Sequence, residues 1–112
     1  MYPLIYHKSL TAEKWFNYPA FKQLLMIANE LGRARSGLEA GDSGIAVHAW
    51  ERAFELTDLT TEDPKNHHLR KEILRFRELL GEAFVTCDGE LNDQLLEGLI
   101  RMDAEAYRMM TG

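Results

Sequence analysis

The chain has 112 residues, is 46% hydrophobic and 10% aromatic, and carries a net charge of −5, as expected for one compact domain with a single core. The negative charge argues against indiscriminate binding to nucleic acid, because nonspecific affinity for phosphates comes from an excess of lysine and arginine. Cys87 is the only cysteine, which excludes an intrachain disulfide and a thiolate metal cluster. We find neither a membrane-length apolar run nor a secretory leader pattern, so we expect a soluble cytoplasmic protein.

Residues 1–16 predict an arm followed by a short helical turn. The apolar side chains Tyr2, Leu4 and Tyr6 follow neither a helical nor a strand period. We expect this arm to pack on the body of the protein or on a neighbouring chain. Thr11 is expected to cap the helical turn that follows.

Four amphipathic helices are predicted after the arm, because apolar residues recur at spacings of three and four. The expected ranges are residues 19–35, 44–57, 66–85 and 91–110. Gly37, Gly41 and Gly44 are expected to form the turn between the first two helices. Short turns without any alternating strand pattern predict an all-α fold. We expect a single domain, an antiparallel up-and-down four-helix bundle with an N-terminal arm.

The last predicted helix carries a second apolar stripe at Leu96, Ile100 and Tyr107. A bundle helix usually buries one face, so a surplus stripe indicates contact with another chain. Together with the aromatic arm, this stripe predicts a homo-oligomer.

A basic strip is predicted on the third helix and consists of Arg70, Lys71, Arg75 and Arg77. One interpretation is an ordinary solvated face with local ion pairs such as Arg75 with Glu78. The other is a binding patch for nucleic acid or an acidic partner. The strongly acidic last helix can match these charges as well as phosphates can, so both interpretations stay open.

A polar corner is predicted where the second helix meets the third. It contains Arg52, Glu55, Asp58, Asp63 and Pro64. Carboxylates and guanidinium groups that meet at such a corner form paired hydrogen bonds, and proline sets the backbone angle. We expect this set to be structural.

A metal site is an alternative that His48, Glu51, His68 and Glu72 suggest. Imidazole and carboxylate groups are ordinary ligands of transition metals. However, di-iron bundles place a histidine three residues after a glutamate, and here His48 precedes Glu51. We therefore expect no cofactor, and keep a small metal-binding or enzymatic bundle as the second hypothesis.

No pattern in the chain predicts nucleophilic catalysis. Cys87 is followed by Asp88, whose charge raises the pKa of a thiol rather than lowering it. The glycines near residue 41 lack the lysine of a phosphate-binding loop. The sequence therefore favours a protein that is not an enzyme.

Part of the chain resembles a group of small, uncharacterised bacterial helical proteins. The matching residues are Glu51-Arg52-Ala53, Glu55-Leu56, Asp58-Leu59-Thr60, Asp63-Pro64, Leu69-Arg70, Glu72-Ile73, Arg75 and Arg77-Glu78, with a looser match over residues 27–34. In size and expected architecture the chain is also similar to ribosomal RNA intervening-sequence proteins and to the accessory proteins of diversity-generating retroelements. This resemblance implies an oligomeric accessory or scaffold protein that serves a nucleic-acid-processing partner such as a reverse transcriptase.

Overall fold

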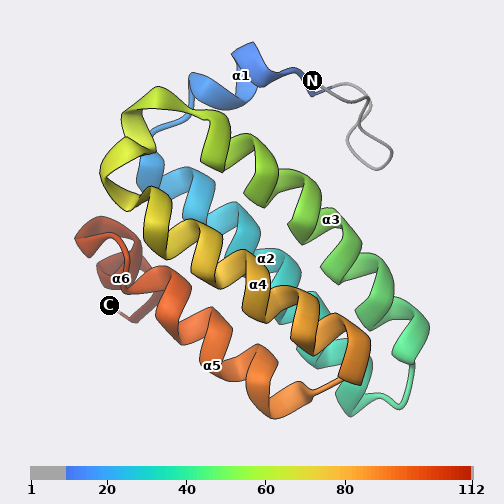
Figure 1. Cartoon of the computed structure of the whole chain (residues 1–112). Coiled ribbons are helices and arrows are strands. Elements are labelled where there is room, and N and C mark those ends of the chain that lie inside the picture. Colours follow the sequence, from blue (N-terminus) through green and yellow to red (C-terminus); the bar gives the residue numbers. More distant parts are fainter. Residues whose placement is uncertain (1–9, 112) are drawn as a thin grey trace.

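The computed structural model describes residues 10–111, and every regular element among them is helical. In chain order the elements are α1 (Ala12–Phe16), α2 (Ala20–Glu39), α3 (Ser43–Glu62), the 3₁₀ helix η1 (Pro64–Leu69), α4 (Arg70–Thr86), α5 (Gly89–Ile100) and α6 (Ala104–Thr111) (Figure 1). The predicted all-α class is confirmed. The arm residues Tyr2, Leu4 and Tyr6 lie outside the described residues.

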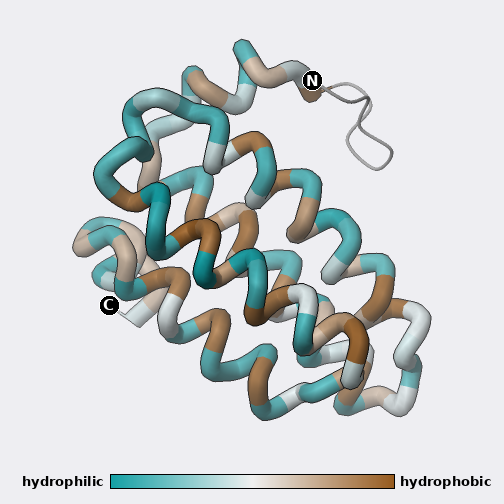
Figure 2. The backbone as a smooth tube through the Cα atoms, in the orientation of Figure 1, coloured by the Kyte–Doolittle hydropathy of each residue, from teal (hydrophilic) through white to brown (hydrophobic). Residues whose placement is uncertain are grey.

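The four long helices lie side by side (Figure 1). Helix α2 packs against α3 and α5, and α4 packs against the same two helices, so all four border one core. Helix α1 packs against α3, and the C-terminal α6 contacts α2 and α5. Figure 2 shows hydrophobic and hydrophilic segments alternating along these helices, as expected for helices that each bury one face.

Two tryptophans and a stripe of small residues define the core. Trp15 of α1 and Trp50 of α3 are both fully buried. Next to Trp50, Ala46, Ala49 and Ala53 are also fully buried. Small side chains on α3 let the neighbouring helix backbones approach closely while the indole fills the remaining space.

The helix starts follow the capping residues of the sequence. The side chain of Thr11 accepts a hydrogen bond from the backbone N–H of Lys14 at 3.1 Å, as predicted. Asp42 starts α3 in the same way, and Asp88 starts α5. Each carboxylate or hydroxyl satisfies an N–H group that the first helical turn leaves without a backbone partner.

Helix α2 is longer than predicted and continues past residue 35 to Glu39. Gly37 is therefore a buried helical residue and not a turn residue, which corrects the prediction. A Cβ atom added to Gly37 would lie 2.9 Å from Cβ and Cγ2 of Ile45. The glycine thus permits close approach of α2 and α3, while Gly41, with a φ of +73°, makes the turn.

Helix α3 also runs past its predicted end at residue 57 and stops at Glu62. Thr60 and Thr61 lie beyond the predicted end, and their hydroxyl groups bond within the helix. Thr60 Oγ1 donates to the carbonyl of Leu56 at 2.7 Å, and Thr61 Oγ1 donates to that of Thr57 at 3.0 Å. This i−4 bonding satisfies the hydroxyl groups without ending the helix.

The predicted last helix over residues 91–110 is two helices in the structure. Helix α5 ends at Ile100, and α6 begins at Ala104 after a bend. Asp103 Oδ1 accepts a hydrogen bond from the N–H of Ala106 at 3.0 Å and so caps the new helix. The apolar spacing continues through the bend, which is why it predicted one helix. Among residues 10–111 no helix is both long and apolar enough to cross a membrane.

Candidate functional site

The predicted basic strip is divided between two sides of α4. Arg77 faces α3, where its Nε donates to Asp58 Oδ1 at 2.6 Å and its guanidinium lies 5.4 Å from the ring centre of Phe54. Lys71 and Arg75 instead border a groove between α4 and α5. The four residues therefore do not form one continuous patch, because Arg77 takes part in the packing of α3 against α4.

The remaining basic residues of the strip are exposed. Arg70 begins α4 and is exposed. Arg75 Nη1 lies 3.9 Å from Glu78 Oε2, and both side chains are largely in solvent. Such exposed pairs contribute little to stability. Lys71 forms no ion pair with any of residues 10–111.

The predicted corner is real but is built partly from other residues. Asp63 is buried and caps η1, and Pro64 occupies the first position of η1. Arg52 does not reach this corner, because its Nε donates to Glu30 Oε2 of α2 at 2.7 Å. Glu55 is buried further back on α3. Asp58 serves the contact with α4 described above.

The corner is closed by a buried set of hydrogen bonds that sequence reasoning missed. Gln23 Nε2 donates to Asp63 Oδ2 and to the carbonyl of Trp15, both at 2.9 Å. Asn66 Nδ2 donates to Gln23 Oε1 at 2.8 Å. The indole of Trp15 donates to Thr60 Oγ1 at 3.0 Å. We call these five residues the corner network. It ties α1, α2, α3 and η1 together.

Lys65 completes the corner network from the surface. Its Nζ donates to the carbonyl of Phe16 at 2.8 Å and forms an ion pair with Asp63. Burial raises the pKa of the Asp63 carboxyl, but hydrogen bonds from Lys65 and Gln23 outweigh this effect and hold the pKa below its ordinary value. The carboxylate is therefore ionised and fully used in structure at neutral pH.

The histidines and glutamates of the metal hypothesis lie at two ends of α3. His48 and Glu51 belong to its first half, with His48 Nδ1 3.9 Å from Glu51 Oε1. His68 lies in η1, beyond the other end of α3, and Glu72 lies in the first turn of α4. From His48 to its end, α3 rises about 21 Å. No group of three or more His, Cys, Asp or Glu in the described part of the chain is placed to hold a metal ion.

The predicted oligomer stripe is mostly inside the molecule. Ile100 is only 5% exposed, so it is a core residue and not a contact for another chain, which corrects the prediction. Leu96 is partly buried and packs against the core. Helix α5 buries two faces because it lies between α2 and α4. Tyr107 stays exposed at 37%, next to Met109 at 56% and Met110 at 44%.

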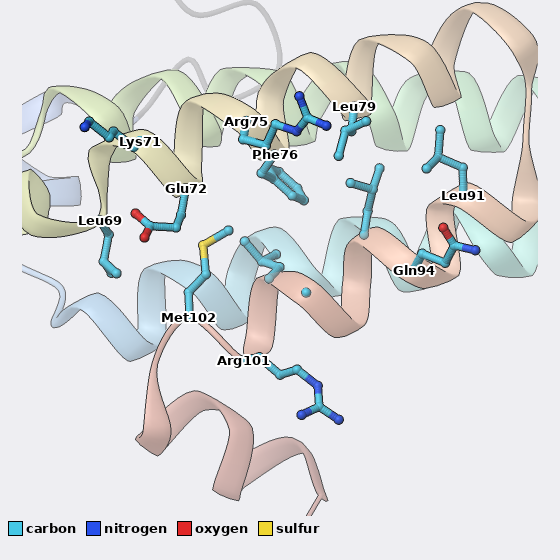
Figure 3. A pocket seen from close by; sticks show the side chains of 13 residues that line it. Leu69, Lys71, Glu72, Arg75, Phe76, Leu79, Leu91, Gln94, Arg101 and Met102 are labelled. Atoms are coloured by element: carbon cyan, nitrogen blue, oxygen red, sulfur yellow. The ribbon is translucent and has the colours of Figure 1, made fainter.

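A groove of about 660 Å³ lies between α4 and α5 (Figure 3). We call it the α4–α5 groove. Its apolar lining consists of Leu69, Phe76, Leu79, Leu91, Leu95, Leu99 and Met102, with Gly98 in the same row. Its polar lining consists of Lys71, Glu72, Arg75, Gln94 and Arg101.

The apolar rows of the α4–α5 groove can be recognised in the sequence, but the sequence does not show that they line an open groove. In the sequence Leu91, Leu95 and Met102 recur at helical spacing, which is the pattern of a face that packs into a core. In the structure Leu95 is buried, while Leu91 and Met102 are only partly buried and line the groove. Sequence spacing alone does not distinguish a residue buried in the core from one that lines the groove, because both kinds recur at spacings of three and four residues. The matching row on α4 has the same ambiguity.

The chain matches no protein-family model, no curated protein and no solved structure.

Proposed function

We propose that the chain is a non-enzymatic accessory or scaffold protein that self-associates and binds a protein partner. One observation carries this proposal. Most polar side chains buried within residues 10–111 bond to one another or to the backbone, while the α4–α5 groove leaves an apolar surface open. Buried polar groups that already bond within the protein are not available to act on a substrate. An open apolar surface, in contrast, favours association with another protein.

The same proposal treats α2, α3, α4 and α5 as an antiparallel up-and-down four-helix bundle. Their pairwise packing in a closed order supports this architecture. The resemblance to accessory proteins of retroelements supports a nucleic-acid-processing partner such as a reverse transcriptase.

Self-association is proposed to use the exposed end of α6. Tyr107, Met109 and Met110 stand together on a short helix and are all exposed. Exposed methionines are adaptable contact residues because their side chains are unbranched and polarisable. Of the predicted oligomer contact, Tyr107 is the residue on this helix, and it stays exposed.

The proposal is tested by the molar mass of the purified protein in solution. Sedimentation velocity at about 100 µM should show a dimer or larger species. The double variant Met109→Lys with Met110→Lys should lower the mass, whereas Arg108→Gln on the same helix should not. A monomeric mass at this concentration would contradict the proposed self-association.

Direct binding to nucleic acid is a separate arm of the test. Binding of a short single-stranded RNA should be weak and should fall with salt, because only a few phosphates can be neutralised. Arg70→Gln with Lys71→Gln should abolish it, whereas Arg77→Lys should leave it in place. If the protein shows no salt-sensitive binding to the RNA, the proposal that this surface contacts nucleic acid is wrong, and only a protein partner remains.

A further inference from the structure

We propose that the α4–α5 groove docks an acidic amphipathic helix of a protein partner. This inference rests on the proposed scaffold function and names the chemistry of the partner at one surface.

The lining of the groove has the spacing that a third helix would meet. On α5 the lining positions Leu91, Leu95 and Gly98 are four and three residues apart, and Met102 follows four residues later, just past the end of the helix. On the other side Leu69 at the end of η1 is followed by Glu72, Phe76 and Leu79 of α4, at spacings of three, four and three. Rows with this period accept the side chains of a facing helix between them. The close-up shows the two helices running alongside each other with apolar side chains between them (Figure 3).

The docked helix is proposed to approach α5 most closely at Gly98. It is exposed, it lines the groove, and a Cβ atom added to it would have no neighbour within 4 Å. Glycine within a helix costs stability relative to alanine, so its presence at an uncrowded position is not explained by packing inside this chain. A small residue lets the backbone of a docked helix approach closely.

The charges bordering the groove select an acidic occupant. Lys71, Arg75 and Arg101 are cations, and Glu72 is the one carboxylate in the lining. Arg75 is paired loosely with Glu78, and Arg101 with Glu97 at 2.8 Å. Both pairs are exposed and therefore weak, so carboxylates of a partner can replace them. The surrounding protein is acidic overall, which makes this basic edge a local exception.

The occupant is a helix and not an extended strand. Every element of the described chain is helical, so these residues offer no sheet edge to which a strand could add. From residue 91 to its end at Ile100, α5 spans about 14 Å. Between two and three turns of an amphipathic helix have this length and present apolar side chains at spacings of three and four.

The test uses a fluorescein-labelled peptide of about 14 residues with leucine at helical spacing and glutamate elsewhere. Fluorescence anisotropy with the full chain should show saturable binding. A peptide with lysine in place of glutamate should bind at least tenfold more weakly because of charge complementarity. Equal binding of the two peptides, or no binding of the glutamate peptide up to about 1 mM, would overturn the proposal.

Two variants of the protein locate the site. Gly98→Gln fills the groove and should weaken binding about tenfold, a difference expected when a close contact is lost. Gly32→Gln is the matched control, because Gly32 is also helical and a Cβ atom there meets nothing within 4 Å. Lys71→Glu should weaken binding, while Lys22→Glu on α2 should not. Unchanged affinity in Gly98→Gln would place the peptide elsewhere.

A second copy of the chain is the competing occupant, and sedimentation distinguishes it. If Gly98→Gln converts an oligomer into a monomer, the groove holds a second copy and the proposed partner helix is wrong. If Gly98→Gln leaves the mass unchanged but loses the peptide, the partner helix is supported. Failure of the scaffold proposal appears separately, as a monomeric parent chain that still binds the peptide.

Discussion

Trp50 and Asn92 are joined by a hydrogen bond in the centre of the protein, where the indole Nε1 donates to the side-chain oxygen of Asn92 at 2.8 Å. The Asn92 amide in turn donates to the carbonyl of Leu31 at 3.0 Å. One asparagine thus connects α2, α3 and α5, and both side chains are fully buried. An amide in this position fixes how the three helices meet, because no apolar side chain can satisfy the same groups.

Asn92→Leu should therefore lower the free energy of unfolding by about 2–4 kcal/mol, since it leaves a buried indole N–H without a partner. Urea denaturation measures this loss. Asp93→Leu is the neighbouring control, because Asp93 makes an exposed ion pair with Arg35 and should change stability by less than about 1 kcal/mol. Trp50→Phe leaves a cavity of its own, so the pairing is tested by additivity. The separate losses of Trp50→Phe and Asn92→Leu should sum to more than the loss of the double variant, and additive losses would refute the pairing.

The division of the basic strip predicts different roles for two arginines. Arg77→Ala removes the bonds to Asp58 and the contact with Phe54, and should destabilise the protein by about 1 kcal/mol. Arg75→Ala should change stability by less than about 0.5 kcal/mol, because its pair with Glu78 is long and exposed.

The same two variants should reverse their order in a binding assay with the acidic peptide. Arg75→Ala should weaken peptide binding, because Arg75 borders the α4–α5 groove, whereas Arg77→Ala should not. Equal effects of both variants on stability would contradict the division of the strip.

Acid should weaken the corner network through Asp63. Hydrogen bonds from Lys65 and Gln23 depress the pKa of the Asp63 carboxyl in the folded state. The ionised group therefore stabilises the fold above the unfolded pKa of about 3.9, and this contribution is lost as the pH falls through the folded pKa.

The expected observation is a stability difference between the parent and Asp63→Asn that is greatest near neutral pH and shrinks toward acid. Chemical denaturation at several pH values measures it. Asp93→Asn is the control, because Asp93 is exposed. Parallel pH profiles for the parent and Asp63→Asn would show that the carboxylate does not carry the effect.

Two helical glycines should respond in opposite ways to alanine. Gly98→Ala should raise the free energy of unfolding by about 0.5–1 kcal/mol, because the added methyl group meets open space and alanine favours the helix. Gly37→Ala should lower it by about 1–3 kcal/mol, because the methyl group would press on Ile45 and on the backbone N of Ala46. Thermal unfolding of both variants distinguishes these signs, and destabilisation by both would contradict the open space above Gly98.

The helical class and the starts of α2 and α3, to within one residue, could be predicted from the sequence. These follow from local causes: apolar residues at spacings of three and four, and capping side chains at Thr11, Asp42 and Asp88. The same local signals misplaced some helix ends. Gly37 was predicted to lie in a turn, because a glycine alone does not show that a neighbouring helix packs against it. The cap at Asp103 was not predicted, because an aspartate alone does not show that a new helix begins after it.

Which polar residues meet depends on how the helices pack and could not be predicted from the sequence. Gln23 and Asp63 are 40 residues apart, as the hydrogen bond between their side chains records, and Trp50 and Asn92 are 42 apart. Nothing local links such pairs, because their partners are chosen by how the helices pack. The same packing turned Ile100 inward, directed Arg77 toward α3 and left Lys71 beside the α4–α5 groove. Helical spacing predicts that one face of a helix is apolar. Whether that face is buried in the core or stays at the surface depends on the helices that pack against it.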